Sequence, residues 1–154
     1  MRTVVGVISD THGLLRPDAL RALRGSDLIV HAGDIGSPDI LLQLAELSPV
    51  IAIRGNIDWD DWAYDLPPVA VVDIGGLTFY VLHNLKTLDL KPEIAGFAAV
   101  ISGHSHVPAQ KTRHGVLYFN PGSAGPRRFT LPVAVGRLLI SDSEIRAEHI
   151  MLDV

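Results

Sequence analysis

Residues 3–13 read TVVGVISDTHG, a short apolar run that ends in a cluster of polar side chains. The segment Thr3–Ser9 is rich in valine and apolar at almost every position, which predicts a strand that is covered on both faces. Strands of this kind belong to parallel sheets, so this segment favours an α/β fold. Asp10 and His12 follow the strand directly, where α/β folds place their functional side chains.

Two helices alternate with two further strands after this opening segment. Pro17 and Gly25 bound a first helix, because proline suits the first helical position and glycine the position past the end. Ser37, a good N-cap, and Pro49 bound a second helix in the same way. The buried strands expected beside these helices are Leu28–His31 and Val50–Ile53. The order β-α-β-α-β predicts a parallel sheet with right-handed crossovers.

The remainder of the chain is richer in strand signals. Val69–Asp73 and Leu77–Leu82 flank a Gly-Gly pair and predict a hairpin. A short helix is expected within Leu88–Ala95, where Pro92 limits its length. The other expected strands are Ala98–Ser102, Val116–Phe119, Pro132–Ile140 and Ser143–Ile150. This mixture predicts two sheets packed face to face with helices outside, in a single domain that spans residues 1–154.

Composition and charge exclude several classes of protein. The chain has no cysteine, which excludes a disulfide framework, a cysteine nucleophile and a thiolate zinc site. Its net charge of -4 argues against a broad basic face, so we expect no stable nucleic-acid binding. No apolar run approaches the roughly 18 residues of a membrane span, and no secretory signal pattern is visible. We therefore expect a cytoplasmic protein that is not membrane-bound, and the sequence leaves a homo-oligomer open.

Side chains of metal-binding type recur at the ends of the expected strands. The seven are Asp10, His12, Asp34, Asn56, His83, His104 and His106. Two carboxylates, one amide and four imidazoles suit a pair of divalent ions. Asp10 and His12 stand two apart, so in extended chain they would point to the same side. Taken singly, most of the seven are better explained as turn, cap or core residues, whereas the paired imidazoles of His104 and His106 indicate metal binding or proton transfer.

The joint order of these motifs resembles the calcineurin-like metallophosphoesterase superfamily, whose motifs are D-x-H, G-D, G-N, H and G-H-x-H. More closely, the chain resembles the small bacterial and archaeal phosphodiesterases of that superfamily, over residues 4–128 or so. The segments that carry this closer resemblance are Ile8–Gly13, His31–Asp34, Arg54–Asn56 and Asn120–Ser123. The resemblance implies a four-layer α/β/β/α sandwich of two mixed sheets.

The resemblance also implies a role for each of the seven side chains. One divalent metal would be held by Asp10, His12 and His106, the other by Asn56, His83 and His104, and Asp34 would bridge the two. The implied activity is that of a phosphodiesterase that acts on a small phosphodiester, with a metal-bridging hydroxide as the nucleophile. Asp34, Asn56 and His83 are the residues we expect to be catalytic. Nitrogen and oxygen ligands accept manganese, iron, nickel or zinc, so metal identity stays open.

The chain departs from the superfamily pattern at two positions. Ile57 follows Gly55-Asn56 where many members carry a histidine that protonates the leaving group. We therefore predict a preference for activated diesters over simple monoesters. Asp58 is expected to be a surface turn residue, with a substitute acid or a partner of the ligands as alternatives. Asn84 replaces a glycine that relatives usually carry after His83, and its side chain is expected to narrow the metal cleft or re-aim His83.

A non-catalytic protein-interaction scaffold of the same fold is the alternative to the enzyme. The superfamily offers a precedent in a subunit of the retromer coat, which resembles these small enzymes and serves as a binding platform. A scaffold is expected to lose one or more ligands, whereas this chain has all seven, which favours the enzyme.

Other polar residues near the motifs receive simpler interpretations. Arg127 and Arg128 either attract a phosphate substrate or form a solvated pair. His31 is expected to donate a hydrogen bond that supports the site rather than to bind metal. His114 and His149 have no partner in the sequence, and we expect both at the surface.

Overall fold

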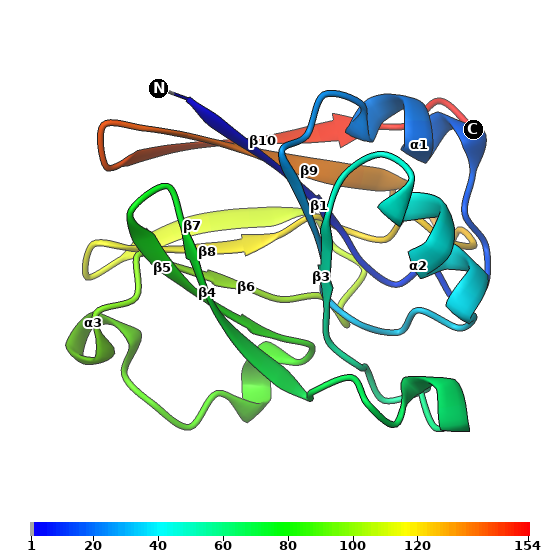
Figure 1. Cartoon of the computed structure of the whole chain (residues 1–154), viewed down its shortest axis with the longest axis horizontal. Helices are drawn as coiled ribbons and strands as arrows, with labels where there is room; N and C mark the ends of the chain where they lie inside the picture. Colours follow the sequence, from blue (N-terminus) through cyan, green and yellow to red (C-terminus); the bar gives the residue numbers. More distant parts are fainter. Residues whose placement is uncertain (1) are drawn as a thin grey trace.

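Two five-stranded sheets face each other in the computed structural model, which describes residues 2–154 (Figure 1). The first sheet has the order β10-β9-β1-β2-β3, with β1 (Thr3–Ile8), β2 (Leu28–His31), β3 (Val50–Ala52), β9 (Ala134–Ser141) and β10 (Glu144–Met151). The second has the order β4-β5-β6-β8-β7, with β4 (Val69–Ile74), β5 (Leu77–Leu82), β6 (Ala99–Ile101), β7 (Ala109–Arg113) and β8 (Val116–Asn120). The predicted pair of mixed sheets is confirmed.

Each sheet contains three parallel strands that end at the same level. In the first sheet Ile8 pairs with His31, and His31 pairs with Ala52. In the second sheet β5, β6 and β8 are likewise parallel, and Ile101 pairs with Phe119. Because the carboxyl ends of parallel strands meet at one edge, the loops that leave these six strands converge there.

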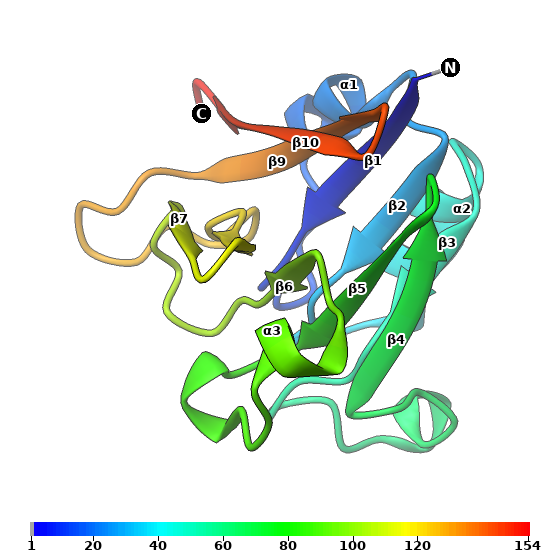
Figure 2. The same ribbon diagram turned by 90° about the vertical axis from the view of Figure 1, so that its left-hand side faces the viewer.

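Helices cover the outer faces of the two sheets unequally. Figure 2 shows α1 (Pro17–Leu23) and α2 (Pro38–Ala45) beside the first sheet and α3 (Pro92–Ala95) on the other side of the molecule. The second sheet otherwise carries the single turn η2 (Leu85–Thr87), so its helical layer is thin. Trp62 of the other single turn, η1 (Asp61–Ala63), packs against the core cluster beneath α1 and α2. None of the helices in residues 2–154 has the length and hydropathy of a membrane-spanning segment.

The helices begin where local chemistry predicts. Ser37 caps α2 by accepting a hydrogen bond from the Asp39 backbone N–H, and Pro38 occupies the first turn. Pro92 was expected to limit the third helix, but it begins α3 instead, because a missing N–H is harmless in the first turn. The left-handed residue Gly96 then ends the helix.

Two further expectations differ from the structure. Strand β7 was not predicted, because all of its residues are exposed and it lacks the apolar alternation that marks a half-buried strand. His149 was expected at the surface, but its ring stacks on Phe119 with a centroid separation of 4.7 Å. The Nε2 atom of His149 also lies 2.7 Å from the Asn120 carbonyl oxygen. His114 is exposed, as expected.

The core between the sheets is closed at one point by a glycine that lies against an aromatic ring. Phe119 of β8 is 1 % exposed, and Gly136 of β9 faces it from the opposite sheet. A Cβ added to Gly136 would lie 2.5 Å from the ring Cζ of Phe119 and 3.3 Å from the Cβ of Pro121. The two sheets therefore reach their separation only with glycine at this position.

We expect Gly136→Ala to destabilise the fold by about 1–3 kcal/mol, because the added methyl group overpacks the interface between the sheets. Chemical denaturation measures the change in the free energy of unfolding. The matched control places Gly136→Ala in a Phe119→Leu background, where a shorter side chain leaves room for the methyl group. If alanine costs as much in that background as in the native chain, the ring of Phe119 does not set the constraint.

Candidate metal centre

The seven candidate ligands lie together at the edge where the parallel strands of both sheets end. Asp10 and His12 follow β1, Asp34 follows β2, Asn56 follows β3, His83 follows β5, and His104 and His106 follow β6. Six of them form two groups in which each residue offers one ligand atom, and these atoms lie within 4.8 Å of one another: Asp10, His12 and His106, and Asp34, His83 and His104. Each group combines residues from both sheets.

Asp34 belongs to the second group and also faces the first. Its Oδ2 atom is 3.2 Å from the Nε2 of His83 and 3.5 Å from the Nε2 of His12. The Oδ1 of Asp10 is 3.4 Å from the Nε2 of His106 and 3.8 Å from the Nε2 atoms of His12 and His83. One carboxylate oxygen of each aspartate therefore faces imidazoles of both groups.

Asn56 lies beside the second group. Its Oδ1 is 3.2 Å from the Nδ1 of His104, which is itself 3.3 Å from the Nε2 of His83. The Nδ1 of His83 lies 2.7 Å from the carbonyl oxygen of Ala32, which turns its Nε2 toward the carboxylates. Asn56 thus has an amide oxygen where a ligand of the second group would need one.

The turn that carries Asn56 also fixes Asp34. The backbone N–H of Ile57 donates to the Oδ1 of Asp34 at 3.1 Å, which leaves Oδ2 for the imidazoles. Gly55 permits this approach, because a Cβ there would lie 2.9 Å from the Asp34 Cγ. The Gly-Asn pair therefore serves close packing as well as ligand supply.

Asp58 supports the same turn, and its expected place at the surface is wrong. The residue is 6 % exposed. Its carboxylate accepts hydrogen bonds from the backbone N–H groups of Ile35 and Gly36 at 3.1 Å and of Gly55 at 2.8 Å. Asp58 thus ties the loop after β2 to the loop after β3. This is the supporting role that the sequence left as an alternative.

His31 supports the loops that follow β1 and β2. The backbone N–H of Gly33 donates to its Nδ1 at 3.1 Å, so the ring proton resides on Nε2 and points to the Thr11 hydroxyl at 3.0 Å. That hydroxyl donates to the Ile35 carbonyl oxygen at 2.8 Å. Complete burial lowers the pKa of His31 to about 4, so the ring stays neutral. These contacts agree with the expected hydrogen-bond donor.

The backbone is strained at most of the candidate ligands. Nine non-glycine residues in 2–154 have a positive φ, and five of these are Asp10, His12, Asp34, His104 and His106. The expectation that Asp10 and His12 lie in extended chain is therefore wrong, since their φ angles are 57° and 48°. Left-handed residues of this kind cost about 1–3 kcal/mol each and cluster at functional sites. The loops therefore adopt strained backbone conformations that direct these side chains to one place.

The two aspartates remain ionised despite their burial. Burial by itself raises the pKa of Asp10, but the nearby imidazoles of His106 and His12 and the hydrogen bond from Ser9 outweigh it and lower the pKa. The pKa of Asp34 is lowered in the same way, with burial opposed chiefly by the hydrogen bond from His83. The pKa of His12 is raised chiefly by the neighbouring carboxylate of Asp10. Two buried anions are thus available to a cation.

Unpaired polar atoms show what this arrangement lacks. Asp10 Oδ1 and His12 Nε2 are buried without a hydrogen-bond partner among residues 2–154. Both are ligand atoms of the first group. Buried polar atoms are rarely left unpaired, and a divalent cation would satisfy both at once. The donor set of carboxylates and imidazoles therefore fits divalent metal ions.

Asn84 has a role that the sequence did not reveal. Its side chain caps η2 by accepting a hydrogen bond from the Lys86 backbone N–H at 3.0 Å. Asn84 also lines the cavity beside His104, and the narrowing of the metal cleft or re-aiming of His83 stays a prediction.

The Asn120–Ser123 turn braces the ligand loops. Asn120 Nδ2 donates to the carbonyl oxygen of Gly103 at 2.9 Å and to the hydroxyl of Ser105 at 3.1 Å. Ser123 donates to the backbone oxygen of Asp10 at 3.1 Å. The turn therefore connects the loop after β6 to the loop after β1.

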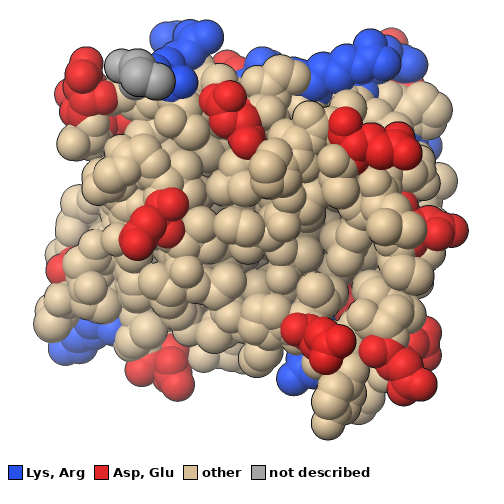
Figure 3. Space-filling view, viewed as in Figure 1, with Lys and Arg blue, Asp and Glu red and all other residues tan. Residues whose placement is uncertain are grey.

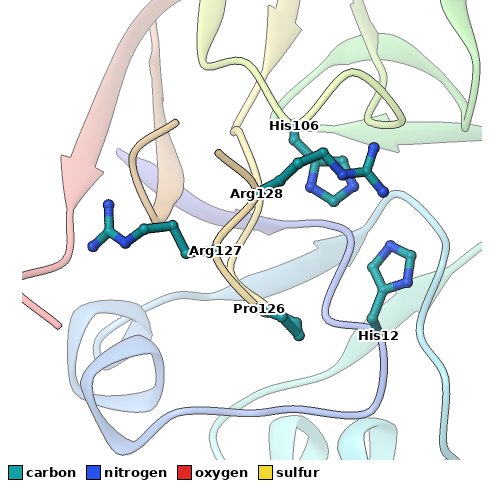
Figure 4. A pocket seen from close by; sticks show the side chains of 5 residues that line it. All are labelled: His12, His106, Pro126, Arg127 and Arg128. Atoms are coloured by element: carbon teal, nitrogen blue, oxygen red, sulfur yellow. The ribbon is translucent and has the colours of Figure 1, made fainter. Parts of the chain in front are cut away.

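A cavity of about 210 Å³ adjoins the first group, and two arginines line it together with His12 and His106 (Figure 4). Arg127 points away and donates to the backbone oxygens of Leu131 and Val154. Arg128 extends over the cavity, and its charge opposes the protonation of His12. The pair is therefore divided between a structural arginine and one that faces the candidate ligands.

The fold is shared with proteins of known structure. An archaeal phosphodiesterase superimposes with a TM-score of 0.81 at 24% sequence identity, over 97% of this chain and 100% of that one. Vacuolar Protein Sorting 29 from Cryptosporidium parvum superimposes with a TM-score of 0.77 at 16% identity, over 98% of both chains. At these identities the comparisons show the fold alone.

Sequence comparisons identify the family. A probable metallophosphoesterase from Methanothermobacter thermautotrophicus is 35% identical over an alignment of 162 positions, which covers 96% of this chain and 91% of that protein. Residues 3–143 match the family model of the calcineurin-like phosphoesterase superfamily domain. The family, the fold and the clustered ligands agree, and this chain belongs to the calcineurin-like phosphoesterase superfamily.

Proposed function

We propose that this protein is a dinuclear metal-dependent phosphodiesterase that acts on a small phosphodiester. The observation that carries the proposal is the position of Asp34 between two groups of ligands, each drawn from both sheets. Membership of a metallophosphoesterase family supports hydrolysis of phosphate esters. The absence of cysteine agrees with a reducing compartment, and we propose the cytoplasm as its location.

We assign the ligands as the motifs suggest: Asp10, His12 and His106 to one ion, Asn56, His83 and His104 to the other, and Asp34 to both. Two divalent ions, whether manganese, iron, nickel or zinc, would polarise a phosphate ester and lower the pKa of a water nucleophile. The protein contributes the fixed geometry, since the Ile57 backbone N–H donates to Asp34 and the Ala32 carbonyl oxygen accepts a hydrogen bond from His83.

The remaining polar groups suggest how a substrate is bound and which substrates react. Arg128 is positioned to neutralise charge on the phosphoryl oxygens, because it extends over the cavity beside His12 and His106. Ile57 is partly exposed beside the second group and cannot donate a proton. Leaving groups that depart without protonation, such as nitrophenolate, should therefore react best.

A non-catalytic scaffold is the second candidate, and the fold shared with Vacuolar Protein Sorting 29 favours it at the level of architecture. The retention of all seven candidate ligands supports the enzyme instead.

Asp34→Asn should lower bound metal and reduce turnover of bis(4-nitrophenyl) phosphate by at least about a hundredfold, because it removes the shared carboxylate. Asparagine tolerates the φ of 57° at this position, so the fold should survive. Elemental analysis and steady-state kinetics measure both effects. Asp142→Asn is the matched control, since Asp142 is exposed and has a φ of 51° in a hairpin turn. Unchanged metal content and turnover in Asp34→Asn would refute the shared role.

The native protein should hydrolyse bis(4-nitrophenyl) phosphate with a higher kcat/KM than 4-nitrophenyl phosphate. Ile57→His should raise turnover of phenyl phosphate by about tenfold or more, because a general acid contributes about 10²–10⁴-fold where the leaving group needs a proton. Ile57→Leu keeps the position apolar and serves as the control. A native enzyme that prefers the monoester would contradict this account of Ile57.

Arg128→Gln should lower kcat/KM for bis(4-nitrophenyl) phosphate by about tenfold, because the cation faces the cavity beside the ligands. Arg127→Gln is the control, since Arg127 is engaged by backbone oxygens of Leu131 and Val154. Initial rates at low substrate concentration measure the ratio directly. Equal losses in the two variants would mean that the arginines do not differ in function.

A further inference from the structure

A second and larger cavity, of about 740 Å³, opens beside the second ligand group. His104 is a member of that group and also lines this cavity. We call it the β7 groove; its lining includes Lys86, His104, Lys111, Arg113, Tyr118 and Arg128. Lys111 pairs with Tyr118 across β7 and β8, so their side chains share one face of the second sheet. Arg113 lies two residues along the same face, with its guanidinium 6.0 Å from the Tyr118 ring centroid.

The groove exists because the helical layer on the second sheet is incomplete. Leu88, Leu90 and Phe97 pack against the outer faces of β5 and β6 around Tyr80 and Leu82. Every residue of β7 remains exposed, and β7 forms the edge of the sheet. An open channel therefore remains along β7 and β8, with η2 on one side.

The charged residues of the groove all have the same sign. Lys86, Lys111, Arg113 and Arg128 line it, and no carboxylate among residues 2–154 does so. None of the four forms an ion pair within that part of the chain. The whole chain has a net charge of -4, and charges of both signs are scattered over the face in Figure 3. Local concentration of cations against the overall charge favours an anionic occupant.

The groove is continuous with the candidate metal centre. Arg128 lines both the groove and the smaller cavity beside His12 and His106. His104 belongs to the second ligand group and also to the groove wall. A molecule whose phosphodiester lies at the ligands can therefore extend along β7 without leaving the protein surface.

We propose that the β7 groove binds a second phosphate of the substrate, so that the preferred substrate is a small phosphodiester with a further phosphate group. The inference rests on the proposed phosphodiesterase function for its catalytic part, and on the four cations for its binding part. Lys111 and Arg113 are the residues that would contact the second phosphate, because they follow Ala109 along the exposed edge strand, and Ala109 pairs with Asn120 beside the ligand loops.

Two substrates with one leaving group test the proposal: thymidine 5′-(4-nitrophenyl phosphate), with and without a 3′-phosphate. The native protein should hydrolyse the 3′-phosphorylated compound with a kcat/KM about tenfold higher, and raising the ionic strength should reduce this ratio because salt screens exposed charges. Lys111→Gln/Arg113→Gln should bring the ratio close to one and leave turnover of bis(4-nitrophenyl) phosphate unchanged. Arg146→Gln, which neutralises an exposed cation on the edge strand of the other sheet, should keep the ratio.

A binding measurement separates failure of the groove from failure of the enzyme. Calorimetry should show that thymidine 3′,5′-bisphosphate binds about tenfold more tightly than thymidine 5′-phosphate, and that the double variant loses this difference. If no diester is hydrolysed but the binding difference stands, the proposed activity is wrong and the groove is right. If bis(4-nitrophenyl) phosphate is hydrolysed while the 3′-phosphate improves neither kcat/KM nor binding, the groove proposal is wrong.

Discussion

Two negative charges buried at one sheet edge are the constraint on which this structure depends. Asp10 is 0 % exposed and Asp34 is 3 % exposed, and burial together with the charge of Asp10 opposes the ionisation of Asp34. Neither charge is tolerable without compensation, because desolvation and mutual repulsion both oppose ionisation. The surrounding imidazoles and backbone N–H groups supply that compensation, and left-handed loop residues bring them within reach.

The groups that compensate the two buried charges come from both sheets, so the geometry of the site depends on how the sheets pack together. Asp10 follows β1 of the first sheet, yet its Oδ2 accepts from the backbone N–H of His104, which follows β6 of the second, at 3.0 Å. Ser9 donates to the same oxygen at 2.7 Å. The close approach of Phe119 to Gly136 sets the distance between the sheets. A change in that distance would therefore separate the carboxylate from its donors.

Local patterns in the sequence predicted most helices and strands. They also predicted that the seven candidate ligands lie at one site. The valine-rich segment Thr3–Ser9 and the Ser37 cap depend on nearest neighbours, and both were predicted close to their observed bounds. The edge strand β7 carries no apolar alternation and was missed. For Asp58 a surface position was preferred over the supporting role that the structure shows. Its three backbone donors come from loops that only folding brings together, so the sequence carries no sign of them. The left-handed conformations of the loop residues were not predicted for the same reason, since only the assembled site requires them.

The exposed edge strand β7 affects the tendency of the protein to self-associate. An edge strand presents unpaired backbone groups to which another chain can add, and proteins commonly prevent such addition with outward cations. Lys111 and Arg113 on β7 repel the same strand of an approaching copy. A bound polyanion would cancel that repulsion, so crowded, phosphate-rich solutions are where self-association through this edge becomes easiest.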